Sequence, residues 1–390
     1  MRTYREIFSL REFRVLFAAR CLTMAAISLG SLALGTTTYA STGSPLLTAL
    51  AMFVGPVISL IGSSTVLGAS DSLRPVRAAA VMPLAYAVAF LLQTLPGLPW
   101  GARFALLAIP YLAGSATGGS TMRLLHDIVP PDGFVLGRAT LNLAVGVTQV
   151  VGFALGGLLL VWFSPTALFL VAAVAAALTA LVLRLGIRER PANQPTEGLV
   201  SRTRTVNRTL LGSPVTRPLY LAMWVPNGLV VGCEALFVPY GGPGGAGNLF
   251  AVTAAGMLLG DVLMGRFVPP GRRDALILPL PYLAFALRPA LPLALVLGFV
   301  ASVGYSAQLA LQERLVHATD TAVRGQVWGL YSTGLMVGQA VGAAVGGLVA
   351  TWVPAGPTMG LLAAASVAVS LALTGGLRRS APEPSRRSVS

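Results

Sequence analysis

The sequence predicts an all-α membrane protein with 12 transmembrane helices, arranged as two pseudo-symmetric six-helix bundles. Three observations lead to this prediction: the 390 residues are 55% apolar and only 10% charged, apolar spans recur along the chain, and the second half partly repeats the first. A soluble protein carries about 25% charged residues, so these charges are too few to cover a water-facing surface. With only two cysteines and no collagen-type glycine period, disulfide scaffolds and fibrous proteins are excluded as well.

Apolar spans account for most of the length. A helix needs about 20 apolar residues to cross the hydrocarbon core, so 12 crossings leave room for short loops and no large soluble domain. Turn residues separate most of the spans. The expected spans are 14–40, 45–68, 76–96, 101–124, 138–162, 165–185, 218–240, 247–267, 274–290, 292–315, 326–351 and 357–376. The span 274–290 is the weakest, because it contains three prolines and Arg288.

The arginines orient these spans. The chain has 27 basic residues, none of them lysine, and a net charge of +14. With the N-terminus in the cytoplasm, every arginine except Arg103 and Arg288 falls on the cytoplasmic side. The positive-inside rule therefore predicts a multi-pass protein of the plasma (inner) membrane with both termini cytoplasmic. It also explains the basic charge without a nucleic-acid partner.

Two sequence matches relate the halves of the chain. Gly152–Trp162 (GFALGGLLLVW) matches Gly342–Trp352 (GAAVGGLVATW), and Arg123-Leu-Leu-His126 matches Arg314-Leu-Val-His317. The offsets are 190 and 191 residues, about half the chain, so they predict an internal repeat. The expected organisation is a six-helix half 1–185, a basic cytoplasmic linker 186–217, a six-helix half 218–377 and a disordered tail 378–390. The linker is either a solvated connection or a docking site for anionic lipid or a partner.

Three local patterns resemble the major facilitator superfamily, and the resemblance covers nearly the whole chain. The segment 68–77 has the Gly, Asp and arginines of a cytoplasmic gating motif, and the start of the span 326–351 is similar to that of the superfamily's helix 11. The span 138–162 keeps the glycines of an antiporter motif but has Phe153 in place of its proline. The resemblance extends to bacterial drug and metabolite exporters, the macrolide-efflux-like branch included. It implies the superfamily fold, a monomer, and transport by rocking of the two halves.

Glu234 is the strongest candidate for a residue that takes part in proton exchange. It is the only carboxylate well inside an expected span and away from the cytoplasmic boundary. An ionised carboxylate in the hydrocarbon costs at least about 2.5–3.5 kcal/mol, so its presence indicates function. Two interpretations stay open: a carboxyl that exchanges a proton during transport, or a protonated side chain that makes a fixed hydrogen bond or faces the outer vestibule.

Polar residues inside the spans are candidates for a substrate cavity. They are few, and aromatic and small residues surround them, which favours a large lipophilic substrate over a sugar. The candidates are Arg20, Asn142, Gln149, Trp224, Asn227, Tyr305, Gln308 and Gln339. Arg20 either extends to the inner interface or lines the cavity and meets an anionic group.

Charged residues near the cytoplasmic helix ends are candidates for an inner gate. Asp127 is expected to pair with Arg74 or Arg77, and Glu313 with Arg272 or Arg273. His126 and His317 are expected to cap helix ends rather than relay protons. The gate candidates are Asp71, Arg74, Arg77, Asp127, Asp261, Arg266, Glu313 and Arg324.

Glycines spaced four residues apart are candidates for close helix packing. They are Gly152, Gly156 and Gly157 in the first half and Gly342, Gly346 and Gly347 in the second. If the two halves rock, these helices are expected to meet across the interface between the halves.

These features together predict a secondary active transporter that exports a lipophilic drug or metabolite by proton antiport. Its expected partners are membrane lipid, a small-molecule substrate and protons. A facilitator or importer of a small metabolite on the same fold is the alternative, followed by a non-transporting membrane protein. The sequence shows no paired intramembrane acids, metal-ligand cluster, nucleophile or P-loop, so no enzyme activity, metal or cofactor is expected.

Overall fold

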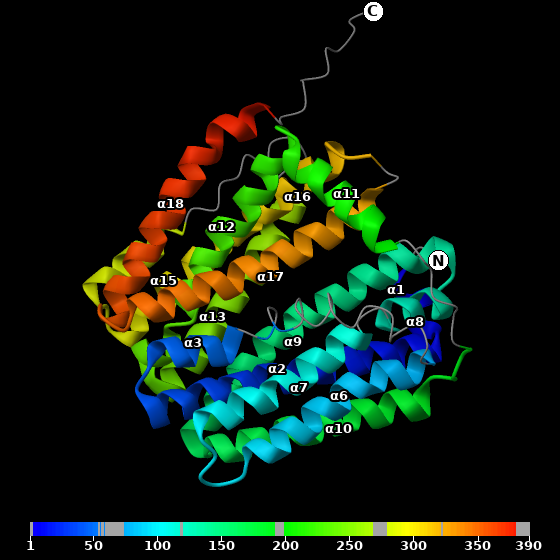
Figure 1. Ribbon diagram of the computed structural model, residues 1–390, viewed down its shortest axis with the longest axis horizontal. Coiled ribbons are helices and arrows are strands. Elements are labelled where there is room, and N and C mark those ends of the chain that lie inside the picture. Colours follow the sequence, from blue (N-terminus) through cyan, green and yellow to red (C-terminus); the bar gives the residue numbers. More distant parts are fainter. Residues whose placement is uncertain are drawn as a thin grey trace, which may run out of the picture. The chain divides into compact units, whose positions relative to one another are not determined.

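The computed structural model describes residues 3–53, 55, 58, 74–117, 120–191, 199–267, 279–320 and 323–379. Within these residues the regular structure is helical (Figure 1). Seven described helices are long and apolar enough to cross a membrane: Arg11–Thr42, Pro75–Gln93, Pro165–Gly186, Gly244–Leu263, Leu291–His317, Gln326–Val349 and Ala355–Leu377. The chain is therefore a multi-pass, all-α membrane protein, as the sequence predicts.

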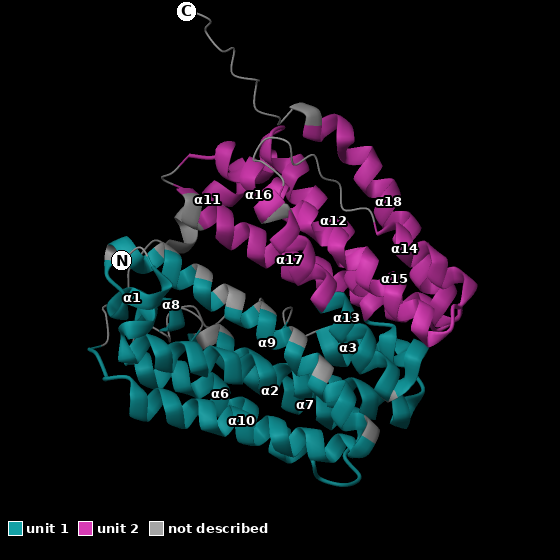
Figure 2. Ribbon diagram, turned by 180° about the vertical axis from the view of Figure 1, so that it is seen from behind, with its two compact units in different colours: residues 1–196, 235–254 teal, residues 197–234, 255–390 magenta. Residues whose placement is uncertain are grey.

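The chain divides into two compact units. Unit 1 comprises residues 1–196 and 235–254, and unit 2 comprises residues 197–234 and 255–390 (Figure 2). These bounds differ from the expected halves chiefly at 235–254, which group with unit 1. The halves themselves stay a prediction.

Unit 1 is built around three long helices that pack side by side: α2, α6 and α10. Its elements are α1 (Tyr4–Ser9), α2 (Arg11–Thr42), α3 (Pro45–Phe53), α6 (Pro75–Gln93), α7 (Trp100–Thr117), α8 (Ser120–Ile128), η1 (Pro131–Gly133), α9 (Phe134–Trp162), α10 (Pro165–Gly186) and the first part of α13 (Phe237–Phe267). Local signals set the helix ends. Gly43, at φ 62°, ends α2, and the Ser164 hydroxyl caps α10, which Pro165 opens.

Unit 2 is centred on α12, which packs against α17 and α18. Its elements are α11 (Leu199–Gly212), α12 (Thr216–Glu234), the rest of α13, α14 (Leu280–Leu283), η2 (Ala284–Leu287), α15 (Leu291–Val303), η3 (Gly304–Ser306), α16 (Ala307–His317), α17 (Arg324–Val349) and α18 (Ala355–Arg379). Helix α11 lies in the expected linker, where no helix was predicted. Its Leu210 is buried in an apolar cluster with Leu219 and Leu315, so this part of the linker belongs to the folded unit.

Two irregular points, a turn and a kink, lie between α12 and the main part of α13. Helix α12 ends at Glu234, and the next helical residue is Phe237. Inside α13, Gly242 has φ 66° and ψ −176°, a conformation that in practice only glycine adopts. Two expected spans, 218–240 and 247–267, thus meet at this kink. Of the weak span 274–290, the described residues from 279 form only the short α14 and η2.

Candidate functional site

Several cavity candidates come together in unit 2, around Pro226 of α12. The Tyr305 hydroxyl donates a hydrogen bond to the Asn227 carbonyl at 3.4 Å, and Gln339 Nε2 donates to Asn227 Oδ1 at 3.1 Å. The Ser366 hydroxyl donates to the Pro226 carbonyl at 3.3 Å. Four elements, α12, η3, α17 and α18, are therefore joined through polar groups where the proline interrupts the helix's own hydrogen bonds.

A second group of polar side chains continues this network. Trp224 Nε1 donates to the Tyr331 carbonyl at 3.0 Å, and the Tyr331 hydroxyl donates to Gln308 Oε1 at 2.7 Å. Gln308 Nε2 donates to the Met223 carbonyl at 3.4 Å, and Gln312 Nε2 donates to the Tyr331 hydroxyl at 2.9 Å. Tyr331 and Gln312 were not among the predicted cavity residues. The four-residue spacing of Gln308 and Gln312, which puts both on one helix face, could have identified Gln312, whereas no sequence signal identifies Tyr331.

Glu234 is buried at the C-terminal end of α12. The residue is 8% exposed, and its Oε1 has no hydrogen-bond partner in the part of the chain that the structure describes. Ala235 and Leu236 form a turn between Glu234 and the start of α13 at Phe237. A carboxyl in this position combines burial, an unmet hydrogen-bonding group and a break in the helix.

The remaining cavity candidates belong to unit 1. Arg20 on α2 is half-buried and lines a small cavity. Gln149 lies exposed on α9, and the side chain of Asn142 is outside the described residues. The structure therefore gathers the second-half candidates in two hydrogen-bonded groups on neighbouring turns of α12, whereas Arg20 and Gln149 belong to neither group.

At the expected cytoplasmic end of unit 1, acidic side chains hold the segment that follows α10. Arg77 Nε lies 3.7 Å from a Glu189 carboxylate oxygen, and the other oxygen accepts the Val76 N–H at 3.0 Å. Asp127 lies 3.9 Å from Arg190. The prediction that Asp127 pairs with Arg74 or Arg77 was therefore wrong, because the segment after α10 supplies the partners of both Arg77 and Asp127.

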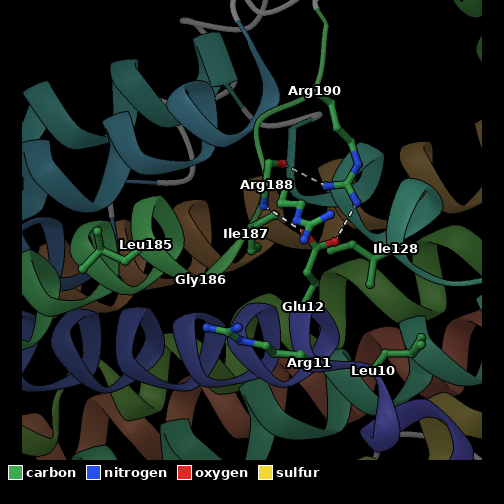
Figure 3. Close-up of a pocket in the computed structure, with 9 residues that line it drawn as sticks. All are labelled: Leu10, Arg11, Glu12, Ile128, Leu185, Gly186, Ile187, Arg188 and Arg190. Atoms are coloured by element: carbon green, nitrogen blue, oxygen red, sulfur yellow. Dashed lines mark hydrogen bonds and ion pairs between the residues drawn. The ribbon is translucent and has the colours of Figure 1, made fainter.

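The centre of this arrangement is Glu12 on α2. One of its oxygens accepts the Arg188 N–H at 2.9 Å and the other accepts from Arg190 at 2.7 Å, which Figure 3 shows. A cavity of about 650 Å³ lies beside this contact, lined also by Arg11 and Leu185. The carboxylate satisfies both a backbone donor and a guanidinium, so it attaches the start of the linker to α2.

The other gate candidates are less connected. Asp71 lies outside the described residues, and so do the proposed partners of Glu313, residues 272 and 273. Asp261 is exposed, with no ion pair among the described residues, and the Arg266 guanidinium lies 6.0 Å from the Phe267 ring centroid. Arg324 opens α17, but its side chain is not described. An inner gate in unit 2 therefore stays a prediction.

The repeated Arg-Leu-X-His segments occupy matching places in the two units. Arg123 on α8 donates to the Pro191 carbonyl just after α10, and Arg314 on α16 donates to the Leu377 carbonyl near the end of α18, both at 2.5 Å. Each arginine thus holds the end of a long helix two expected spans further along the chain. This contact gives the sequence repeat a structural counterpart.

Removing these contacts tests their contribution to stability. We expect Arg314→Gln to lower the thermal midpoint of unfolding more than Arg123→Gln does, because the Arg314 contact is partly buried and the Arg123 contact is exposed. A hydrogen bond from a charged group contributes about 1.5–3 kcal/mol, and the exposed contact less. Arg217→Gln, at an exposed position, is the control in a thermal melt of the purified protein. Equal midpoints in all four proteins would show that the contacts contribute nothing.

The packing glycines contact helices of their own unit. In unit 2, a Cβ on Gly342 would lie 1.8 Å from the Gly228 carbonyl oxygen, and one on Gly346 would lie 2.6 Å from that of Gly232. Gly347 is also buried on α17. The partner of the first two glycines is α12, because the nearest atoms belong to Gly228 and Gly232. Glycine on both helices lets the two backbones approach this closely. On α17 these glycines therefore serve packing within unit 2, and contact between helices of the two halves stays a prediction.

The glycines of α9 divide between two partners in unit 1. A Cβ on Gly152 would lie 2.8 Å from Ser28 Cβ, and one on Gly156 would lie 3.1 Å from Leu29, so both residues face α2. Gly157 instead faces the first part of α13, where a Cβ on it would lie 2.4 Å from Gly247 Cα. The α9–α2 contact in unit 1 matches the α17–α12 contact in unit 2.

Comparison with known proteins supports the fold. No protein-family profile matches the chain, and no curated protein sequence matches it. Solved structures do. A bacterial homologue of the human lysosomal transporter Spinster, in an inward-facing and unoccupied conformation, has a TM-score of 0.67 at 16% identity, covering 95% of each chain. A POT family transporter in complex with 5-aminolevulinic acid has a TM-score of 0.74 at 12% identity, covering 95% of this chain and 97% of that one. A peptide transporter POT in complex with sulfate has a TM-score of 0.71 at 14% identity, covering 95% of each.

These similarities define the class of fold. Coverage of nearly the whole of both chains means that the chain has the fold of major facilitator-type transporters, as the sequence predicts. At such identities the likeness concerns the fold alone.

Proposed function

We propose that the protein is a secondary active transporter of the plasma (inner) membrane that exports a lipophilic drug or metabolite by proton antiport. Both termini are cytoplasmic, and the protein works as a monomer by alternating access, without enzyme activity or a cofactor. The observation that carries the proposal is Glu234, a buried carboxyl with an unmet oxygen at a break in α12.

The chemistry of Glu234 fits proton coupling. A charged carboxylate without a partner is costly inside a membrane, whereas a neutral carboxyl is tolerated. A break in the helix next to it gives the chain a place where backbone angles can change as access alternates. In this proposal Glu234 alone takes up a proton when it faces one side of the membrane and releases it when it faces the other.

Proton movement in inverted membrane vesicles tests this function. After an acid-inside gradient is imposed, macrolides, dyes and other lipophilic compounds are added, and the interior pH is followed with a fluorescent probe. We expect at least one compound to trigger proton release from wild type, because its uptake into the vesicle is exchanged for protons. We expect Glu234→Gln to abolish this release, because the amide cannot titrate.

Glu234→Asp is the matched control, since it keeps the carboxyl and moves it by one methylene. We expect it to retain part of the release. Release that persists in Glu234→Gln would remove Glu234 from the coupling step. Transport of a compound without any proton release would favour the alternative function, a facilitator or importer on the same fold.

A further inference from the structure

Unit 1 contains a second polar site, separate from the network in unit 2. A cavity of about 180 Å³ lies between α2, α6, α8 and α9, with Thr117 at the end of α7 also on its wall. Arg20 and Arg138 line it together with Ser120 and Thr121. Met82 and Met122 form apolar parts of its wall. The site therefore combines two guanidinium groups with hydroxyls and an apolar surface.

Arg20 is half-buried and Arg138 is exposed, and neither is paired within the part of the chain that the structure describes. Neither Arg20 nor Arg138 makes a side-chain hydrogen bond or ion pair with any described residue, and no described carboxylate lines the cavity. Arg20 is half-buried within an apolar helix, where an unpaired charge is unfavourable and indicates a functional site. Extension of Arg20 to the membrane interface does not account for a second arginine at the same cavity.

The hydrogen-bonding groups point to one class of ligand. The Thr117 hydroxyl donates to Ala113 and the Ser120 hydroxyl donates to Thr117, whereas the Thr121 hydroxyl has no partner among the described residues. The donors left for a ligand are therefore the Thr121 hydroxyl and two guanidinium forks. Such forks match the paired oxygens of a carboxylate or a phosphate. A neutral ligand would leave the half-buried charge of Arg20 without a counter-charge among the described residues.

We propose that this cavity binds the anionic group of the transported compound, so that the substrate is a lipophilic organic anion bearing a carboxylate or a phosphate. This inference rests on the proposed transport function and narrows its substrate class. A volume of about 180 Å³ is below the roughly 300–1,000 Å³ of pockets that enclose a drug-sized ligand, so the cavity accommodates the charged group but not the whole molecule. The apolar remainder of the compound lies outside the cavity, beyond the two methionines. An inside-negative membrane potential also favours outward movement of a negative charge.

Binding of 1-naphthyl phosphate and 1-naphthoate to the purified protein tests this inference without a transport assay. The thermal midpoint is measured in a non-ionic detergent against concentration of each probe, with 1-naphthalenemethanol as the uncharged counterpart. We expect both anions to raise the midpoint of wild type and the alcohol to leave it unchanged. Arg20→Gln and Arg138→Gln should each weaken the apparent affinity for the anions at least tenfold, because one of the two cationic forks is lost.

Arg184→Gln, an exposed arginine at the end of α10, is the control and should bind like wild type. If Arg20→Gln does not fold, Arg138→Gln at its exposed position still decides the outcome. Unchanged affinity in the variants, or no stabilisation by either anion, would overturn the proposal. Equal affinity for inorganic phosphate would overturn the assignment to an organic anion. Because the readout is binding, a failure here is distinct from a failure of proton release in vesicles.

Discussion

Replacing Gly342 with alanine is expected to destabilise unit 2 by about 3 kcal/mol or more, near the upper end of the usual cost of overpacking. The added Cβ would lie 1.8 Å from the Gly228 carbonyl oxygen and 2.3 Å from its carbonyl carbon. Both are backbone atoms of α12, so no side-chain rotation relieves the clash, and α12 and α17 must separate. For a unit of this size we expect the thermal midpoint to fall by roughly 6–12 °C, measured on purified protein.

The same helix supplies the control for this prediction. Gly329 on α17 has no atom within 4 Å of the position where a Cβ would lie. Gly329→Ala should therefore leave the midpoint unchanged or raise it, because alanine is favoured over glycine in a helix by up to about 1 kcal/mol. Equal effects of the two substitutions would contradict the close α12–α17 contact.

Gly247→Ala is expected to stop transport while the protein still folds. A Cβ on Gly247 would lie 1.9 Å from Gly157 Cα, so α9 and the first part of α13 could no longer meet. Beside this contact, the rings of Phe153 and Phe250 stack with centroids 4.6 Å apart. Among the described residues, the contact between α9 and α13 is much smaller than that between α12 and α17, so its loss is expected to cost less stability. Under the proposed alternating access this contact belongs to one conformation of the cycle, and a transporter that cannot form it is expected not to complete the cycle.

The rate of compound-triggered proton release checks this second prediction, and a melt of the same protein reports on folding. We expect the rate to fall at least tenfold and the midpoint to change less than it does in Gly342→Ala. Gly101→Ala is the control, since a Cβ there meets no atom within 4 Å. An unchanged release rate in Gly247→Ala would show that the α9–α13 contact is not needed during the cycle.

Features with a strong local cause were predictable from the sequence. Apolar length located spans such as Pro165–Gly186, and Ser164 and Pro165 mark the start of this helix. The prolines in 274–290 identified that span as the weakest. The match of Arg123 to Arg314 was visible in the sequence. In the structure each residue donates a hydrogen bond to a backbone carbonyl near the end of a long helix. These features depend on neighbouring residues or on a fixed offset, so one sequence is enough to find them.

Features that depend on tertiary partners were not predictable. Charge counting paired Asp127 with the nearest arginines in an assumed loop geometry, but Arg190 reaches it after the chain folds back beyond α10. The glycines of α17 were visible as a motif, but their spacing does not name the helix that they contact. Arg138 was passed over because an arginine near a cytoplasmic helix end is ordinary. Only the cavity that it shares with Arg20 sets it apart.

Accumulation in proteoliposomes tests the central claim, coupling of outward substrate movement to protons, most directly. Purified protein is reconstituted, an acid-inside gradient is imposed, and the internal concentration is measured for a compound that triggers proton release in vesicles. We expect accumulation above the external concentration, collapse of this accumulation on addition of a protonophore, and no accumulation with Glu234→Gln. Simple equilibration of the compound, unaffected by the gradient, would contradict proton-coupled export.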